Sequence, residues 1–169
     1  MSIGGDEGEG TGVGFATARG RDWPSVRQFN IFLANRLGAL LNVVKRFETT
    51  DNRIIALTVL DSTDCAIVRV VVNDPERAYE IFEQANLPFT ESDLLVVMLP
   101  DGNQPLLQIC KALLGAEISI HYGYPLMVGH QGRAALALHV EDIETAAAHL
   151  QQRGFTLLSE NELNDGMTE

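Results

Sequence analysis

Two short turns in this sequence carry polar groups that suit the binding of a small charged molecule. The first turn, Asn35-Arg36-Leu37-Gly38, follows an alternating apolar stretch and precedes an apolar stripe with helical spacing. Gly38 allows a close approach of the backbone, and the free amides of a helix beginning near Leu37 favour a carboxylate. The side chain of Asn35 can hydrogen-bond a polar group beside it. The first turn therefore predicts a carboxylate site.

The second turn begins at Asp101, 66 positions after Asn35, and also stands between an apolar strand and a helix. The acidic side chain of Asp101 suits an ammonium group. Together the two turns suit a zwitterionic amino acid. Glycine and Asn or Asp before a helix are also ordinary turn and capping residues, so a purely structural role stays open at this point.

The elements around the two turns repeat. Apolar residues in the two following helices recur 66 positions apart, as Leu40/Leu106, Val43/Ile109, Val44/Cys110 and Phe47/Leu113. The periodicity predicts seven strands, over 26–33, 54–60, 65–72, 94–99, 118–124, 134–140 and 155–158, and a short extended piece over 89–91. It also predicts four helices, over 37–48, over 75–85, after Pro105 and between Asp142 and Gly154. The order βαββαβ therefore occurs twice.

This order predicts an α+β fold of two ferredoxin-like modules, each a four-stranded antiparallel sheet with its helices on one face. The first module is expected over residues 26–92 and the second over 93–163, between a flexible glycine-rich leader (1–22) and a tail (164–169). A module of about 65 residues has a marginal core, so the two sheets must join edge to edge or pack face to face. Strands 54–60 and 118–124 are the expected seam.

Composition narrows the range of partners. A net charge of −11 and an aromatic content of 7% argue against nucleic acid as a partner. The sequence has neither a signal pattern nor an apolar run of the roughly 18 residues that a membrane span needs, so we expect no membrane partner and a cytoplasmic location. Seven acidic residues lie near the two ends of the chain and are expected to form a solvated fringe.

Residues for metal binding or nucleophilic catalysis do not converge in the sequence. His121 and His139 fall on one expected hairpin and can face each other, which gives at most two ligands. Ser62 has no histidine near it in the sequence, and Cys65 and Cys110 are expected to be reduced core residues. We therefore expect neither a metal nor another cofactor.

The doubled pattern, with Asn35-Arg36-Leu37-Gly38-Ala39-Leu40 after the first strand, resembles the ACT domain, whose signature at this place is Asp/Asn-Arg-Pro-Gly-x-Leu. The resemblance covers residues 26–163 and is to stand-alone tandem ACT proteins and the small subunit of acetolactate synthase. The sequence departs from the signature in two places. Leu37 stands in the proline position, and Asn103 and Gln104 replace the Pro-Gly pair in the second copy.

The resemblance implies a non-catalytic sensor of a free amino acid that acts as a homodimer and controls an enzyme of amino-acid metabolism. The implied ligand-binding residues are Asn35, Arg36, Leu37, Gly38, Ala39 and Leu40 at the first turn and Asp101, Gly102, Asn103, Gln104 and Pro105 at the second. The wall that faces the ligand has four candidates, chosen only by their location on the edge strands: Leu57, Val59, Tyr122 and Tyr124. Packing in the core or at the seam explains the apolar character of each of them at least as well.

Two alternatives remain open at the level of sequence. Residues 134–158 also resemble a half-module of the glyoxalase-type vicinal oxygen chelate enzymes, in which His139 would be a metal ligand. That family uses βαβββ units, and no second histidine or glutamate stands 66 positions from His139. The other alternative is a ligand-free interaction module that folds and dimerises with degenerate pockets.

Overall fold

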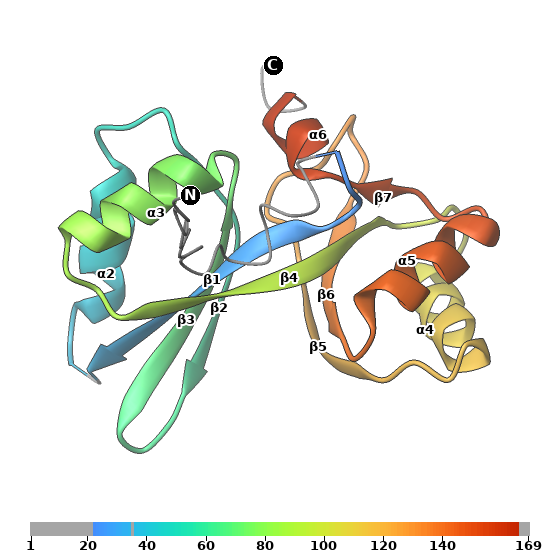
Figure 1. Cartoon of the computed structure of the whole chain (residues 1–169), viewed down its shortest axis with the longest axis horizontal. Coiled ribbons are helices and arrows are strands. Elements are labelled where there is room, and N and C mark those ends of the chain that lie inside the picture. Colours follow the sequence, from blue (N-terminus) through green and yellow to red (C-terminus); the bar gives the residue numbers. More distant parts are fainter. Residues whose placement is uncertain (1–21, 35, 166–169) are drawn as a thin grey trace, which may run out of the picture.

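The protein is described by a computed structural model that covers residues 22–34 and 36–165 (Figure 1). The predicted leader up to residue 21, Asn35 and the last four residues of the predicted tail lie outside the described residues. In order, the elements are β1 (Val26–Ala34), α2 (Ala39–Val44), the 3-10 turn η1 (Lys45–Phe47), β2 (Ile54–Asp61), β3 (Cys65–Val72), α3 (Pro75–Gln84), β4 (Phe89–Met98), α4 (Pro105–Gly115), β5 (Ile120–Pro125), β6 (Ala135–Val140), α5 (Ile143–Gln152), β7 (Leu157–Leu158) and α6 (Glu160–Asp165).

The two modules share one long strand. The strand order is β2-β3-β1-β4-β6-β5, with β7 also paired to β4, and all the pairs are antiparallel. The first half of β4 pairs with β1, whereas residues from Leu95 onward pair with β6. The predicted separation of 89–91 from 94–99 is wrong, because Ser92 and Asp93 break the apolar pattern but still pair with β1. The predicted module boundary between residues 92 and 93 stays a prediction, and β4 runs across it.

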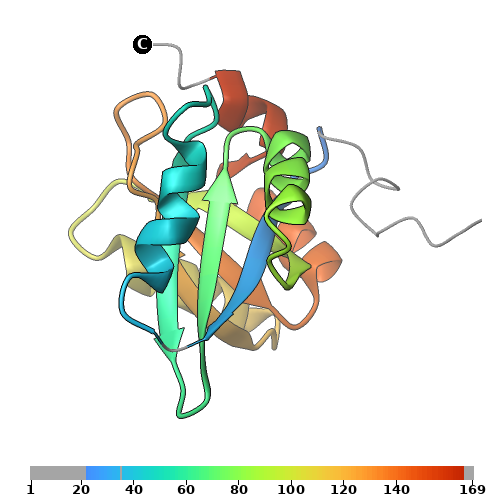
Figure 2. The ribbon, with the colours of Figure 1, turned by 90° about the vertical axis from the view of Figure 1, so that its left-hand side faces the viewer.

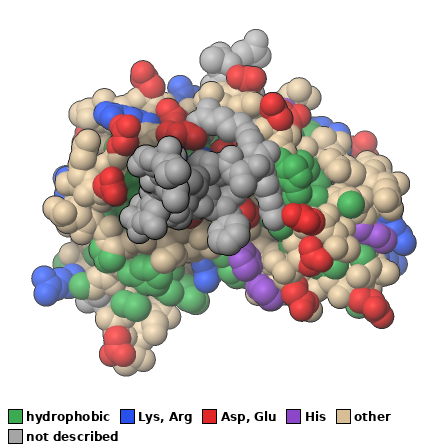
Figure 3. Space-filling view, in the orientation of Figure 1, with side chains coloured by type: hydrophobic (Ala, Val, Ile, Leu, Met, Phe, Trp, Pro, Cys, Tyr) green, Lys and Arg blue, Asp and Glu red, His purple; other side chains and the backbone are tan. Residues whose placement is uncertain are grey.

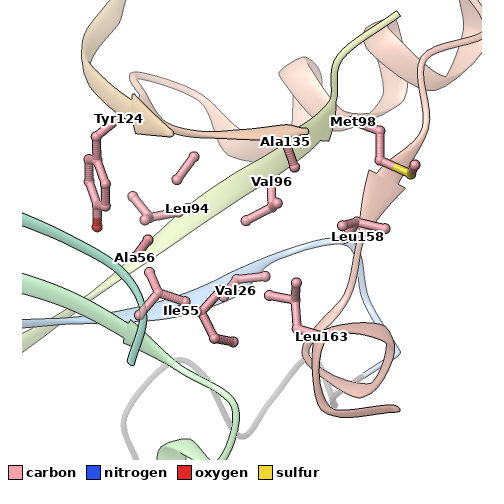
Figure 4. Close-up of a cluster of buried hydrophobic side chains, with 12 residues drawn as sticks. Val26, Ile55, Ala56, Leu94, Val96, Met98, Tyr124, Ala135, Leu158 and Leu163 are labelled. Atoms are coloured by element: carbon pink, nitrogen blue, oxygen red, sulfur yellow. The ribbon is translucent and has the colours of Figure 1, made fainter. Parts of the chain in front are cut away.

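Three buried clusters define the layers of the fold. One lies between the first sheet and α2 and α3, and another lies between the second sheet and α4 and α5. Figure 2 shows α2 and α3 lying on the same face of the first sheet. The third cluster joins the two modules through side chains from both sheets and from α6, including Val26, Val96 and Leu163 (Figure 4). The helix-free faces of the sheets therefore pack on each other.

The predicted seam is observed at one contact. The backbone N–H of Met127, just after β5, donates to the carbonyl of Ile55 in β2 at 2.8 Å. The edge strands therefore approach each other, in addition to the face-to-face packing of the sheets.

Two helix starts follow local capping chemistry. Asp74 accepts a hydrogen bond from the backbone N–H of Arg77 at 3.1 Å, and Pro75 occupies the first position of α3. Asp142 accepts from the N–H of Thr145 at 3.1 Å and from its hydroxyl at 2.6 Å. These hydrogen bonds stabilise the charged carboxylate and lower the pKa of Asp142. Both predicted caps are confirmed.

The predicted apolar stripe of the first helix is only partly buried. Val43 and Phe47 pack on the sheet, whereas Leu40, Leu41 and Val44 are exposed. The helix has apolar residues on two faces, so its periodicity did not decide which face is buried. The prediction that Cys110 is buried is wrong for the same reason, since Cys110 occupies the exposed face of α4 equivalent to Val44. Cys65 is half-buried.

The C-terminal helix α6 was not expected from the sequence. Ser159 and Glu162 form a reciprocal capping box, in which the N–H of Ser159 donates to the Glu162 carboxylate at 2.8 Å and the N–H of Glu162 donates to the Ser159 hydroxyl at 3.4 Å. Leu163 is buried in the cluster that joins the modules. None of the helices in the described part of the chain is long and apolar enough to cross a membrane.

A buried arginine ties four elements together. The guanidinium of Arg27 in β1 lies 3.2 Å from Glu76 of α3, 3.9 Å from Glu91 of β4 and 3.4 Å from Glu160 of α6. The backbone N–H of Arg27 also donates to Glu160 at 3.0 Å. The prediction that the terminal acids are a solvated fringe is therefore wrong for Glu160, whose side chain is 10% exposed.

Glu91 makes the stability of this network depend on pH. Burial raises the pKa of Glu91 above its ordinary value and outweighs the opposite effect of Arg27. A carboxyl whose pKa is raised by folding adds stability that is complete below the unfolded pKa and is lost as the pH rises through the folded pKa. We therefore expect Glu91→Gln to raise the free energy of unfolding modestly at pH 7 and to leave it unchanged or lower at pH 4. Urea denaturation at both pH values checks this, and a less stable variant at pH 7 contradicts it.

Candidate functional site

The first turn forms a left-handed entrance to α2. Gly38 has φ +82°, and its carbonyl accepts from the N–H of Asn42 at 3.0 Å. The N–H of Ala39 donates to the carbonyl of Arg36 at 3.1 Å. A side chain at position 38 would be strained by this backbone conformation, although a Cβ there would meet no atom within 4 Å. Glycine is therefore needed for the shape of the turn, and the space beside it is open.

Two hollows open at this turn, with volumes of about 440 Å³ and about 500 Å³. Both are lined by Leu33, Ala34, Arg36, Leu37 and Ala39. The larger hollow also has Gly38 and Leu40 in its wall, so it contains every described residue predicted for the first turn. Leu37, in the proline position of the signature, is fully exposed at 106%. The structure therefore brings Arg36 to Leu40 together around one open space.

The wall of the larger hollow combines opposite charges with apolar surface. Arg36 comes from the first turn and Asp61 from the end of β2, while Val59 and Ala66 of the hairpin β2–β3 supply apolar surface. A guanidinium is a donor for carboxylates, and a carboxylate accepts from an ammonium group. The hollow therefore offers both partners that a zwitterionic amino acid needs, together with space for an apolar side chain.

Side chains of the protein itself contact the second turn. The Asp101 carboxylate lies 3.6 Å from the Arg133 guanidinium, which also donates to the carbonyl of Leu99 at 2.9 Å. Gln108 donates to the carbonyl of Asp101 at 3.1 Å, and a Cβ on Gly102 would lie 3.0 Å from the Gln108 side chain. Gln104 caps α4 without a side-chain hydrogen bond, and Pro105 has no N–H to offer. Asp101, Gly102, Asn103, Gln104 and Pro105 are all at the surface, but this turn offers a ligand less than the first.

The four candidates for the facing wall lie in different places in the structure. Val59 lines the larger hollow, but Leu57 packs against the core between the first sheet and its helices. Tyr122 and Tyr124 lie on the helix-free side of the second sheet, where Tyr124 is buried and Tyr122 is half-buried. Of the four, Val59 alone lines the hollow at the first turn.

A buried polar cluster between the modules was missed by the sequence analysis. Gln28 of β1 is fully buried and accepts from the Tyr124 hydroxyl at 2.6 Å. Its amide group donates to Asn30 at 2.7 Å and to the Tyr122 hydroxyl at 2.8 Å. Burial raises the pKa of Tyr124, so its hydroxyl stays a donor. The sequence signal for this cluster was the set of polar positions in β1, which were interpreted as the outer face of an alternating strand.

No group of three or more histidine, cysteine, aspartate or glutamate side chains that could hold a metal ion occurs among the described residues. His121 and His139 do face each other as the hairpin predicted, with their Nδ1 atoms 3.1 Å apart. His130 is buried in a loop after β5, and His149 is half-buried on α5.

The fold and the hollow at its first turn define a paired ferredoxin-like α+β protein. The chain belongs to the family described as the ACT domain pair, whose family model matches residues 24–167. The predicted family resemblance is confirmed. The family match and the βαββαβ order decide against the glyoxalase-type alternative for residues 134–158. A search of curated protein sequences gave no match.

Solved structures share the fold at low sequence identity. Protein BT0572 from Bacteroides thetaiotaomicron is similar with a TM-score of 0.75 and 21% identity, over 83% of this chain and 96% of that protein. The regulatory subunit of aspartate kinase from Thermus thermophilus, in its ligand-free form, is similar with a TM-score of 0.52 and 11% identity, over 85% of this chain and 92% of that one. At these identities the likeness concerns the fold alone.

Proposed function

We propose that this ACT domain pair is a non-catalytic regulatory protein that binds a free amino acid in the larger hollow at the first turn. The observation that carries the proposal is the combination of Arg36, Asp61 and an apolar wall around one open space. In this proposal Arg36 binds the ligand carboxylate, Asp61 accepts from its ammonium group, and Val59 and Ala66 contact an apolar side chain.

The regulatory part of the proposal rests on the family and on the exposed surface beside the hollow. Leu37, Leu40 and Leu41 project from the first turn and α2 without burial in the described chain. A homodimer partner or a regulated enzyme that packs on this face would respond to a ligand beneath it. Coupling of about 1–3 kcal/mol between the two events is enough for regulation. The enzyme, the dimer and the cytoplasmic location stay predictions.

Thermal unfolding of the full chain against each of the twenty amino acids tests the proposal. A ligand at about 100 times its dissociation constant adds about 2.7 kcal/mol, which raises Tm by about 5 °C or more for a chain of this size. We expect one or a few amino acids with apolar side chains to give this shift. No shift with any amino acid, in the presence or absence of a candidate enzyme, contradicts the sensor and favours the ligand-free module.

A pair of matched variants locates the site. Arg36→Ala should weaken binding at least about tenfold, because the ligand carboxylate loses a charged hydrogen-bond partner worth about 1.5–3 kcal/mol. Arg133→Ala removes an exposed cation that contacts the second turn and should leave the affinity unchanged. Isothermal titration gives the affinity and the number of ligands, which we expect to be one per chain. Binding that is lost in Arg133→Ala and kept in Arg36→Ala places the ligand at the second turn and overturns the assignment.

A further inference from the structure

A second polar site lies at the mouth of the junction between the modules, on β5 and β6. The pairing of these strands shifts between Ile120 and Tyr122, so His121 is an extra residue in β5. Such a bulge re-aims a side chain, and here the two imidazoles of His121 and His139 face each other. Their ring centroids are 5.2 Å apart with planes inclined at 33°. Figure 3 shows that histidine side chains reach the surface near this part of the molecule.

The distance between the two nitrogens fits a shared metal ion. The Nδ1 atoms of His121 and His139 are 3.1 Å apart. A zinc ion about 2.1 Å from each of two nitrogens, with about 90–110° between its bonds, holds those nitrogens about 3.0–3.4 Å apart. Without an ion, only one of the two Nδ1 atoms can carry the proton between them. A metal ion that replaces this proton needs little movement of either ring.

The residues behind His139 hold its ring in place. The ring stacks on Tyr122 at 4.8 Å with an angle of 5° between the planes, and the Tyr122 hydroxyl accepts from the buried amide of Gln28. Fixed ring orientation is what outer contacts give to metal-binding histidines. Burial also lowers the pKa of His139, which favours the neutral imidazole that binds metals.

The charges near His139 set the limit on affinity. The guanidinium of Arg69 lies 3.8 Å from the centre of the Tyr122 ring and disfavours a cation at the histidine pair, whereas Asp93 of β4 favours one. The protein offers two imidazoles and no third ligand among the described residues, so water completes the coordination. A site of this kind selects ions that prefer imidazole, such as Zn²⁺ and Cu²⁺.

We propose that His121 and His139 form a binding site for one divalent transition-metal ion at the mouth of the junction between the modules. The ion is bound by the two Nδ1 atoms and ties β5 to β6. Through Tyr122 and Gln28 the site is connected to β1 of the first module, so metal binding stabilises the junction. The proposal rests on the geometry of His121 and His139 in the second module and does not depend on the amino-acid site.

Titration of the full chain with ZnCl₂, without a histidine tag, tests this site. We expect one ion per chain by isothermal calorimetry, and a loss of at least about tenfold in affinity in His121→Asn and in His139→Asn. His121 is exposed, so His121→Asn keeps the fold and remains informative if His139→Asn unfolds. His149→Gln and Cys110→Ser are the controls, because each removes another metal-binding side chain outside the site, and both should bind Zn²⁺ as the parent does.

Two results of the titration overturn the proposal. One is the absence of a binding isotherm at millimolar Zn²⁺. The other is binding that persists in His121→Asn or is lost in Cys110→Ser, which assigns the ion to another side chain. A Cu²⁺ spectrum by electron paramagnetic resonance adds an independent readout, in which hyperfine coupling to two imidazole nitrogens is expected and coupling to one or none contradicts the site.

Discussion

Arg27→Ala is expected to lower the free energy of unfolding by about 3–5 kcal/mol, because it leaves the buried carboxylate of Glu160 without its cation. Arg27 is 8% exposed and is shared by Glu76, Glu91 and Glu160. Glu160 is as buried as its partner, so it cannot turn to solvent without moving α6. The loss therefore exceeds the sum expected for surface ion pairs.

The matched control is Arg77→Ala on α3. Arg77 and Glu80 form a closer ion pair at 2.7 Å, but their side chains are 50% and 58% exposed. Exposed pairs contribute about 0.2–1 kcal/mol because water screens them and the side chains lose freedom. Guanidinium denaturation of both variants makes the comparison. Equal losses in Arg27→Ala and Arg77→Ala would contradict the account in which burial, and not distance, decides the energy.

The ion pairs of Arg27 also explain why the sequence patterns did not predict α6. Periodicity finds a helix by its apolar face, and α6 is six residues long with one buried apolar residue, Leu163. Its helical signal is the spacing of Ser159 and Glu162, which is a local capping pattern. Its position is fixed by Glu160 and Arg27, which are 133 positions apart. No short stretch of the sequence contains both Glu160 and Arg27, so a local pattern does not predict their contact.

The parts of the fold that the sequence predicted are those set by local rules. Asp74 with Pro75 and Asp142 mark the starts of α3 and α5, and alternating apolar residues mark β1, β3 and β6. The 66-residue repeat then gave the doubled βαββαβ order. The continuity of β4 did not follow, because polar Ser92 and Asp93 read as a break until β1 supplied their hydrogen-bond partners.

The residues of the candidate site also divide into those that a local pattern predicted and those that only the folded structure brings in. Gly38 was found from the turn, since a glycine before a helix is a local pattern, and Arg36 came from the resemblance to the ACT signature. Asp61 was missed, because it reaches the hollow only after the hairpin β2–β3 folds over the first turn. The two tyrosines on β5 were candidates for this wall by edge position, with core or seam packing as the alternative, and the face-to-face packing of the sheets turns them toward Gln28.

Gln28→Ala is expected to lower the free energy of unfolding by about 3 kcal/mol, although glutamine is a polar residue on a strand. The side chain has no exposed surface, and its amide is bonded to Asn30, Tyr122 and Tyr124. The truncation leaves a cavity and removes the partner of the buried Tyr124 hydroxyl, and an unpaired buried hydroxyl costs about 1–3 kcal/mol.

A double-mutant cycle with Tyr124→Phe separates these causes. Once Gln28 is gone the Tyr124 hydroxyl has no acceptor to lose, so Tyr124→Phe should cost less in the Gln28→Ala background than in the parent, with a coupling of about 1–2 kcal/mol. Urea denaturation measures all four proteins. Costs that add within about 0.5 kcal/mol would mean that Gln28 acts by filling space alone. A large coupling would instead show that the hydrogen bond between β1 and β5 stabilises the contact between the two modules.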